Sequence, residues 1–279
     1  MSASLATVRG VLRPQLAQGA FQLERRLPSA VLADLVEHYW HVRWDLRGLP
    51  PQQQATLPHP STHLVIEGNA ATIHGVHTGR FERRLEGLDF AFGIKFKPGG
   101  FHPFLKAPVS TLANRTLPAQ AVFGADGQSL ASRIASCATL DGMMAVAEDV
   151  LLAHLPAPDP EVARAGTLVA TIAGELGITS VDRLTTATGI DKRALQRLFQ
   201  KYVGIGPKWV IKRYRLHEAV ARIQDGAPVD PVGLALELGY FDQAHFARDF
   251  RALVGLSPTD YARSLSTHHA HKEHRKPAS

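Results

Sequence analysis

Cysteine is almost absent from the sequence: Cys137 is the single one among 279 residues. One thiol excludes an intramolecular disulfide and a cysteine-built zinc site, so we expect a reducing compartment, and the cytoplasm is the expected location. Cys137 lies in an apolar stretch with helical spacing and has no base close to it in the sequence. We therefore expect a buried structural thiol rather than a nucleophile or a redox sensor.

Long apolar runs are missing as well. No segment approaches the roughly 18 apolar residues of a membrane-spanning helix, so we expect no membrane partner. The first residues, MSASLATVRGVLRPQ, lack the charged start and the sustained apolar stretch of a secretion signal. With 45% hydrophobic residues, the chain has the composition of a globular protein and the length of two ordinary domains.

Prolines gather at one point between the two halves of the chain. Residues 155–160, LPAPDP, include three prolines, a composition that disfavours regular structure and is typical of a linker. We expect one domain over residues 1–157, a second over 158–265 and a disordered basic tail over 266–279. The four histidines of this tail are potential metal ligands, although a solvated chain end explains them more simply.

The first half combines strand-like and helix-like patterns. Glycine and proline separate the short apolar stretches HLVIEG, ATIHGVHTG and LDFAFGIKFKPGG, which predict strands. From Phe90 to Phe96 the apolar side chains recur at period two, so they share one face of a sheet while Lys95 and Lys97 point the other way. Helical spacing predicts helices in 31–42 (VLADLVEHYWHV) and 130–155. We therefore expect an α+β domain, a small barrel or sheet flanked by helices.

The second half is predicted to be all α, because helical periodicity continues from the linker to Leu265. Within it, RLFQKYVGIGP from Arg197 to Pro207 recurs 51 residues later as RDFRALVGLSP from Arg248 to Pro258. Arginine, phenylalanine, valine, glycine and proline hold identical places in both copies. Two copies of one structural unit are therefore present.

Each copy follows the plan of a helix-turn-helix unit. A helix-capping residue, a turn glycine and a second capping residue succeed one another: Ser180, Gly189 and Asp191 in the first copy, and Asp230, Gly239 and Asp242 in the second. Before the turn, Ala235 of the second copy allows close helix packing, whereas Thr185 of the first predicts a slightly looser fit. Residues 207–224 predict one long helix between the units, which sets the distance between their second helices.

The second helix of each unit buries one face and leaves another for DNA. Arginine, glutamine and alanine on that face suit the guanine edge, the adenine edge and the thymine methyl group. The expected base-contacting residues are Arg193, Gln196, Arg197, Gln243, Ala244 and Arg248. The expected phosphate-contacting residues are Lys192, Lys201, Lys208 and His245. Taken singly, each is also explained as a solvated side chain, and the arginines as partners of ion pairs within the domain.

Basic residues concentrate in the same region. The net charge of +6 and a pI near 9.6 are compatible with a nucleic-acid partner without requiring one. Eight basic residues and no acidic one lie between Lys192 and Arg215. This stretch is expected to face phosphate, although a solvated basic helix face would have the same composition.

From Val162 to Arg263 the sequence resembles the AraC/XylS family of bacterial transcriptional regulators. The resemblance rests on LQRLFQKYVGIGP, RLHEAVARI, ALELGYFDQAHFARDF and VGLSPTDYAR. It implies a bilobed domain whose two recognition helices read adjacent major-groove segments of an operator, and a transcription factor, such as an activator, without enzymatic activity or cofactor. RNA polymerase, a small-molecule effector and a second copy of the chain are the further partners that it suggests.

Members of this family often carry an effector-binding or dimerising domain, commonly a cupin-like barrel, before the DNA-binding domain. KFKPGGFHPFLKAPVSTLANRTLPAQAVFG resembles the end of a poorly characterised N-terminal domain of such regulators. The candidate effector-contacting residues are Trp40, Trp44, His59, His63 and Phe92. Core packing is the simpler explanation for each of the aromatic residues.

Metal binding by the first half is an alternative that the histidines raise. Five potential ligands lie close together in the sequence, namely His59, His63, Glu67, His74 and His77. The spacing of cupin enzymes, two histidines one residue apart followed by a glutamate, is missing, so we expect no metal.

Two other functions compete with a ligand-responsive regulator. An enzyme fused to a DNA-binding module, as in alkylation-repair adaptors, needs a cysteine cluster that one cysteine cannot supply. A DNA-bending protein without sequence preference does not explain arginine and glutamine on paired recognition helices. We therefore expect a sequence-specific regulator whose N-terminal domain senses a small molecule, with a coupling on the order of 1–3 kcal/mol.

Overall fold

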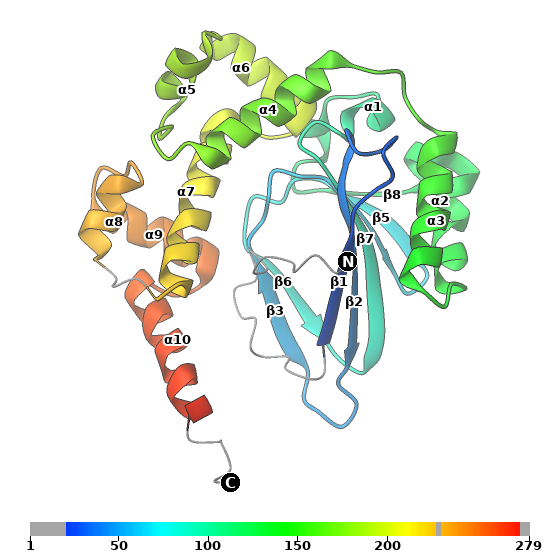
Figure 1. Cartoon of the computed structure of the whole chain (residues 1–279), viewed down its shortest axis with the longest axis horizontal. Helices are drawn as coiled ribbons and strands as arrows, with labels where there is room; N and C mark the ends of the chain where they lie inside the picture. The colour runs from blue at the N-terminus through cyan, green and yellow to red at the C-terminus, as the bar shows by residue number, and fades with distance from the viewer. Residues whose placement is uncertain (1–20, 227–229, 274–279) are drawn as a thin grey trace.

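The computed structural model describes residues 21–226 and 230–273, with side chains to residue 265. A sheet-rich N-terminal part, residues 21–153, lies beside a helical C-terminal part, residues 160–273 (Figure 1). This arrangement confirms the predicted α+β domain followed by an all-α one. The first 20 residues and the last six residues of the predicted tail lie outside the described residues.

The larger sheet of the N-terminal part is antiparallel throughout, with the strand order β1-β2-β7-β4-β5-β8. Its strands are β1 (Phe21–Arg26), β2 (Val36–Asp45), β4 (His63–Glu67), β5 (Ala70–His74), β7 (Leu88–Phe96) and β8 (Thr116–Pro118). Two further strands, β3 (Gln52–Thr56) and β6 (Phe81–Leu85), pair with each other. The period-two prediction for β7 is confirmed, since Phe92, Ile94 and Phe96 are fully buried in one core.

The helix predicted for residues 31–42 is wrong. Residues 30–35 form turns, and Val36 begins β2, which pairs with β1 on one side and β7 on the other. Tyr39, Trp40 and Val42 are aromatic or β-branched residues that suit a strand between two neighbours. This pairing with distant segments overrides the helical spacing of the apolar residues.

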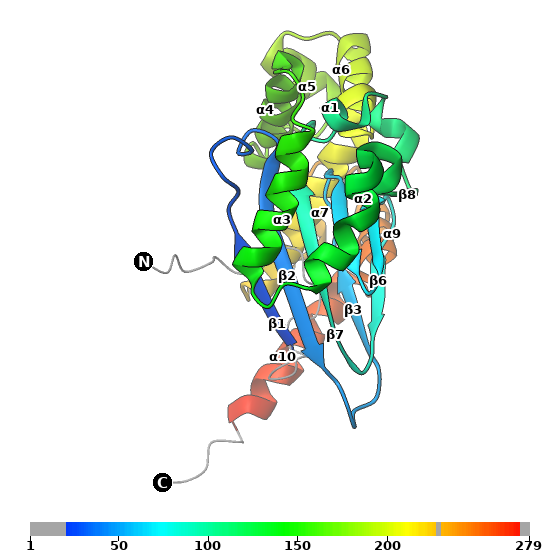
Figure 2. The same cartoon turned by 90° about the vertical axis from the view of Figure 1, so that its right-hand side faces the viewer.

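Helices α2 (Gln120–Ala135) and α3 (Leu140–Ala153) cover one face of the larger sheet (Figure 2). They confirm that residues 130–155 are mostly helical, but this range holds the end of one helix and the whole of a second. Thr139 caps the second helix, α3, by accepting a hydrogen bond from Gly142 N at 3.1 Å. The short helix α1 (His102–Leu105) and the 3-10 turn η1 (Val109–Leu112) connect β7 to β8. On the opposite face, Trp44, Leu46, Leu85 and Ala91 form a smaller core between the two sheets.

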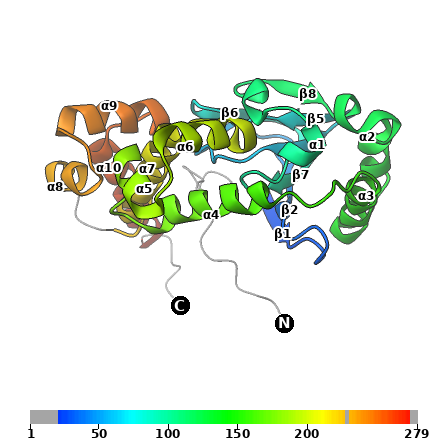
Figure 3. The same ribbon diagram turned by 90° about the horizontal axis from the view of Figure 1, so that it is seen from above.

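The C-terminal part consists of helices. They are α4 (Pro160–Gly174), α5 (Val181–Thr188), α6 (Lys192–Leu198), the π-helical turn η2 (Phe199–Val203), α7 (Pro207–Gln224), α8 (Pro231–Glu237), α9 (Gln243–Val254) and α10 (Pro258–Glu273). Residues 155–159 form neither helix nor strand, and Asp159 caps α4, which leads from α3 to the rest of the helical part (Figure 3). Helix α10 reaches Glu273, so the predicted tail begins inside a helix, to which Ala270 and Lys272 contribute good helix propensity.

Candidate nucleic-acid interface

Two helix-turn-helix units make up most of the C-terminal part: the first unit is α5, α6 and η2, and the second is α8 and α9. The predicted caps and turns are confirmed in both. Asp191 Oδ1 accepts from the backbone N of Arg193 at 2.8 Å and of Ala194 at 3.0 Å. Asp242 Oδ1 accepts from His245 N at 2.6 Å. The turn glycines, Gly189 and Gly239, have φ values of 69° and 78°, in the left-handed region that glycine adopts without strain.

Buried aromatic and aliphatic residues fix the orientation of each recognition helix. Leu195 and Phe199 of the first unit are fully buried in one core, and Phe246 and Phe250 of the second unit are fully buried in another. Helix α7 contributes to both cores, with Val210 and neighbouring residues in the first and Val220 and its neighbours in the second. A single helix therefore sets the spacing of the two recognition helices.

The faces left over carry the residues expected to contact bases. All of them are exposed: Arg193, Gln196 and Arg197 on α6, and Gln243, Ala244 and Arg248 on α9. Among the described residues, none of the three arginines takes part in an ion pair, in contrast to many other arginines of the chain. Guanidinium groups held on exposed helix faces without acidic partners are suited to phosphate oxygens and guanine edges. Base contact by these six residues stays a prediction.

The residues expected to contact phosphate are exposed too, but most already have neighbours. Lys192 forms an ion pair with Asp182 of α5, and His245 lies 3.4 Å from Asp249 Oδ2. The ammonium group of Lys201 lies 5.0 Å from the ring centre of Tyr202, and Lys208 is exposed at the start of α7. The pair of Lys192 with Asp182 is exposed and contributes little to stability, so Lys192 remains able to turn towards phosphate.

The interpretation of the whole basic stretch as a phosphate-facing surface is wrong for two of its eight residues. Arg213 and Arg215 are buried in α7, with exposures of 6% and 2%. They lie three and four positions after the buried Val210 and Ile211, a spacing that placed them on buried faces of the helix.

These two arginines join parts of the fold. Arg213 stacks on Trp209 with 4.5 Å between the guanidinium carbon and the ring centre, and its Nη2 donates to the backbone O of Thr78 in the N-terminal part at 2.6 Å. Burial lowers the pKa of Arg213 to about 10, so it stays charged at neutral pH. Arg215 Nη2 donates to the backbone O of Ile172 and of Glu175, at the end of α4.

The N-terminal part also touches equivalent points of both units. Gly204 and Gly255 end the two recognition helices with φ values of 93° and 89° and occupy the same place in the repeat. A Cβ atom on Gly204 would come 2.8 Å from Val109 Cγ1, and one on Gly255 would overlap Arg80 Nη1. The backbone conformation therefore favours glycine at both positions, and the backbone of Val109 leaves little room for a side chain at Gly204.

The residues expected to contact an effector do not gather around one space. Phe92 is fully buried in the core that faces α2 and α3. Trp40 lies on the opposite face of the sheet, covers Gly93, and has its ring 6.5 Å from that of His63. Trp44 is buried in the smaller core and donates its indole N–H to Glu86 O at 3.1 Å. Phe92 therefore cannot share a surface with the two tryptophans, and their contact with an effector stays a prediction.

His59 and His63 belong instead to a polar layer between the sheet and α7. The ring centre of His59 lies 4.5 Å from that of His217 in α7, and Nε2 of His217 lies 3.1 Å from Pro58 O. Burial lowers the pKa of His217 to about 4 and that of His63 to about 3. These histidines are consequently neutral at neutral pH. Lys95 points away from the core that faces α2 and α3, as predicted. It is nevertheless buried in this polar layer, where its ammonium group pairs with Glu37 at 2.8 Å.

Among the side chains of residues 21–226 and 230–265, no three histidine, cysteine, aspartate or glutamate residues gather in a way that could hold a metal ion. Nor is any helix within these ranges long and apolar enough to cross a membrane.

The families that match the chain divide it as the structure does. Residues 24–118 match a domain of unknown function (DUF6597), and residues 184–264 match a family described as a helix-turn-helix domain. The first range corresponds to the sheet and the second to the two units and the helix that joins them.

Several curated relatives match about a third of the chain. The transcriptional activator AarP of Providencia stuartii is 34% identical over 82 residues, which are 29% of this chain and 60% of AarP. The XylDLEGF operon transcriptional activator 1 of Pseudomonas putida is 35% identical over 86 residues, 30% of this chain and 26% of the activator. This chain thus spans less than two thirds of these curated relatives.

A solved structure is matched over nearly its full length. It is a probable AraC family transcriptional regulator from Rhodopseudomonas palustris CGA009, with 30% sequence identity, coverage of 36% of this chain and 97% of that one, and a TM-score of 0.30. With this relative covered almost completely at 30% identity, the chain belongs to the AraC/XylS family of transcriptional regulators.

Proposed function

We propose that the chain is a sequence-specific DNA-binding regulator of transcription, in which both recognition helices enter the major groove of one operator. The observation that carries this proposal is the pair of aspartate-capped helices, α6 and α9. Both helices expose arginine without an acidic partner among the described residues, and the two units bury equivalent phenylalanines. In this proposal Arg193, Gln196 and Arg197 read one segment of the groove, and Gln243, Ala244 and Arg248 read the next.

Lys192, Lys201, Lys208 and His245 supply the contacts to phosphate in this proposal. Lys192 and His245 lie on the same helices as the base readers, Lys201 lies in η2 directly after α6, and Lys208 lies at the start of α7. Phosphate contacts fix the register of the protein on the duplex without selecting a sequence. The exposed pairs of Lys192 with Asp182 and of His245 with Asp249 would then exchange an acidic partner for a phosphate.

We further propose that residues 1–157 form an effector-sensing domain and residues 158–265 the DNA-binding domain. The coupling between them would pass through α7 and the ends of the recognition helices. The contacts that support this are Arg213 with Thr78, His217 with Pro58, and the close approach of Val109 to Gly204 and of Arg80 to Gly255. A small molecule that shifts the N-terminal part would move the recognition helices relative to each other, and RNA polymerase or a second copy of the chain would be a further partner of the DNA-bound form.

In-vitro selection tests the proposal. The full-length protein is used to select duplexes from a random pool at a fixed, moderate salt concentration, and the enriched duplexes are assayed against random DNA. We expect a motif with two conserved blocks, bound at least about 1,000-fold more tightly than random DNA. Binding that shows no enriched motif and only weakens as salt rises would contradict sequence-specific regulation.

A further inference from the structure

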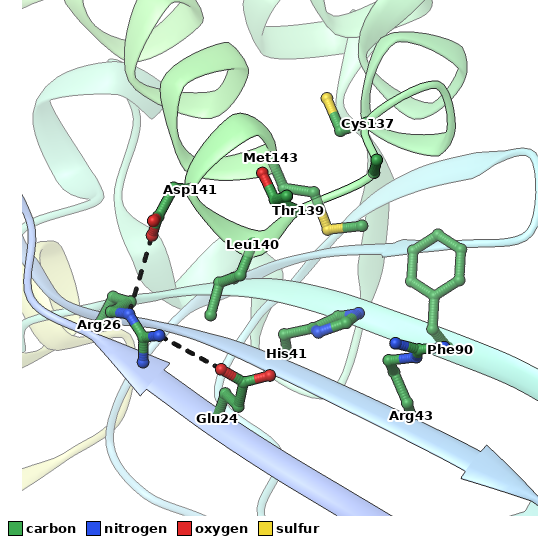
Figure 4. Close-up of a pocket in the computed structure, with 11 residues that line it drawn as sticks. Glu24, Arg26, His41, Arg43, Phe90, Cys137, Thr139, Leu140, Asp141 and Met143 are labelled. Carbon is green, nitrogen blue, oxygen red and sulfur yellow. Dashed lines mark hydrogen bonds and ion pairs between the residues drawn. The ribbon is translucent and has the colours of Figure 1, made fainter.

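A cavity of about 440 Å³ lies on the α3 side of the larger sheet, and its lining includes none of the residues predicted to contact DNA or an effector. Strands β1, β2 and β7 form its floor, and the segment from Cys137 to Met143, at the start of α3, forms its roof (Figure 4). Its size is within the range of small-molecule sites. Cys137 is only half-buried and lines this space, so it is not the fully buried thiol that the sequence predicted.

One wall of the cavity carries a buried polar group without a partner. His41 is 6% exposed, and its Nε2 has no hydrogen-bond partner among the described residues. Burial lowers the pKa of His41, so the ring is neutral at neutral pH and can donate or accept a single hydrogen bond at this nitrogen. A buried polar atom left unpaired costs on the order of 1–3 kcal/mol, which a bound molecule that supplies the partner would recover.

Of the two arginines that line the cavity, one has acidic partners and the other has none among the described residues. Arg26 lies between two carboxylates, 3.3 Å from Glu24 Oε2 and 3.8 Å from Asp141 Oδ1, and these contacts are drawn in Figure 4. Arg43 is exposed at the other side of His41 and has no ion pair among the described residues. The guanidinium of Arg43 and the Nε2 of His41 therefore offer two polar contacts in the same cavity, beside the N-terminal end of α3, where negative charge is favoured.

Apolar side chains complete the lining. The ring of Phe90 lies edge-on to that of His41, with 5.6 Å between their centres, and Leu140 and Met143 face the sheet from the start of α3. A molecule that fits this lining has a negative group at one end and an apolar body at the other.

We propose that this cavity binds a small organic carboxylate with an aromatic ring or a short alkyl chain, whose carboxylate pairs with Arg43 and accepts a hydrogen bond from His41. Its apolar body lies against Phe90, Leu140 and Met143. This inference rests on the proposed function, because it gives the effector a chemical class and a place. Binding would act on the beginning of α3, the helix whose other end leads through residues 155–159 into α4.

Methyl NMR of the full-length protein tests the site directly. The chain has three methionines, and one of them, Met143, lines the cavity, so [13C]methyl-methionine labelling gives a local probe that a Met143→Leu variant assigns. The probes are phenylacetate and octanoate, each compared with its neutral amide. We expect at least one carboxylate to shift the Met143 signal saturably and its amide to bind about tenfold more weakly, the loss of one charge-assisted contact.

Two variants decide whether Arg43 is responsible. Arg43→Gln should weaken binding of the carboxylate about tenfold and leave the amide unaffected. Arg115→Gln is the matched control, because Arg115 is an exposed arginine that lies just before β8 and does not line the cavity. It should bind the carboxylate like the unchanged protein. The inference is overturned if neither carboxylate shifts Met143, if the amides bind equally well, or if Arg43→Gln binds the carboxylate as tightly as Arg115→Gln.

The same samples separate this inference from the proposed function. DNA binding is measured on selected and random duplexes, each with and without the carboxylate probes. If the protein selects a DNA motif while the carboxylates fail to bind, the carboxylate site alone is refuted. If the carboxylates bind through Arg43 while no duplex is selected, the DNA-binding proposal is refuted and the cavity assignment is supported.

Discussion

The two helix-turn-helix units share one design but are attached differently to the N-terminal part. The core of the second unit includes Ala55 and Leu57, from β3 and the residue just after it, together with α7, α9 and their neighbours. The core of the first unit receives only the partly buried Leu35 from the N-terminal part. The second unit thus shares an apolar core with the sheet, whereas the first contacts the N-terminal part through η2, which lies against α1 and η1.

A ring contact and close backbone packing join the first unit to α1 and η1. The ring of His102 lies 4.2 Å from that of Tyr202 in η2, and a Cβ atom on Gly204 would come 2.8 Å from Val109 Cγ1. The two units are therefore joined to the N-terminal part by different contacts: the second through a core shared with β3, and the first through η2 against α1 and η1.

The largest effects are expected from the buried phenylalanines. Phe199→Ala and Phe250→Ala each remove a fully buried ring, so each should lower the free energy of unfolding by about 3–5 kcal/mol, measured by urea denaturation. Hydrogen exchange distinguishes them. Phe250→Ala should also increase exchange in β3, which shares its core, and Phe199→Ala should not. Equal exchange of β3 in both variants would show that the second unit is no more firmly joined to the sheet than the first.

The recognition arginines come next. Arg197→Ala and Arg248→Ala should each weaken binding to the selected duplex by about 1–3 kcal/mol and relax the preference at one base pair. Lys201→Ala serves as the control and should weaken selected and random duplexes alike, as loss of a phosphate contact does. Fluorescence anisotropy at fixed salt measures all three. If the arginine variants lose as much affinity for random DNA as for the selected duplex, these side chains do not read bases.

The contact of the sheet with α7 should depend on pH. Burial lowers the pKa of His217 to about 4, with Arg213 and Lys95 acting in the same direction. The unfolded chain therefore binds this proton more readily, so stability is full above pH of about 6.5 and falls as pH decreases towards 4. Between pH 7 and pH 5 this one group should cost about 2 kcal/mol. His217→Gln should remove that part of the pH dependence, and an unchanged profile would refute it.

The smallest effects are expected from the helix caps. Asp191→Ala and Asp242→Ala should each destabilise their unit by about 1 kcal/mol, measured by thermal unfolding. Asp191 accepts two backbone hydrogen bonds and Asp242 one, so the first substitution should cost more. Asp225→Ala, at an exposed position where no side-chain cap is formed, is the control. A reversed order would mean that the number of cap bonds does not set the cost.

The sequence predicted the helical part well because its signals are local. A cap, a turn glycine and a proline act within a few residues, so the bounds of α5, α7, α8 and α9 followed from the residues themselves. Features that depend on distant segments were missed. Strand β2 is extended because β1 and β7 pair with it, and Arg213 is buried because the N-terminal part lies against α7.

The carboxylate site could not be predicted for the same reason. Its lining joins residues 24–43 to Phe90 and to residues 137–143, which only the fold brings together. Alternation along β7 predicted which of its side chains share a face, but not which face of the sheet would meet which helices. Hence the effector candidates mixed Phe92 from one face of the sheet with Trp40 from the other.

Repeating the selection with the two arginine variants tests whether both recognition helices read one operator. The full-length protein, Arg197→Ala and Arg248→Ala are each used to select from the same random pool. We expect two blocks of sequence preference about 10 base pairs apart, and each variant should lose base preference in a different block. Loss in the same block, or an unchanged motif in either variant, would contradict it.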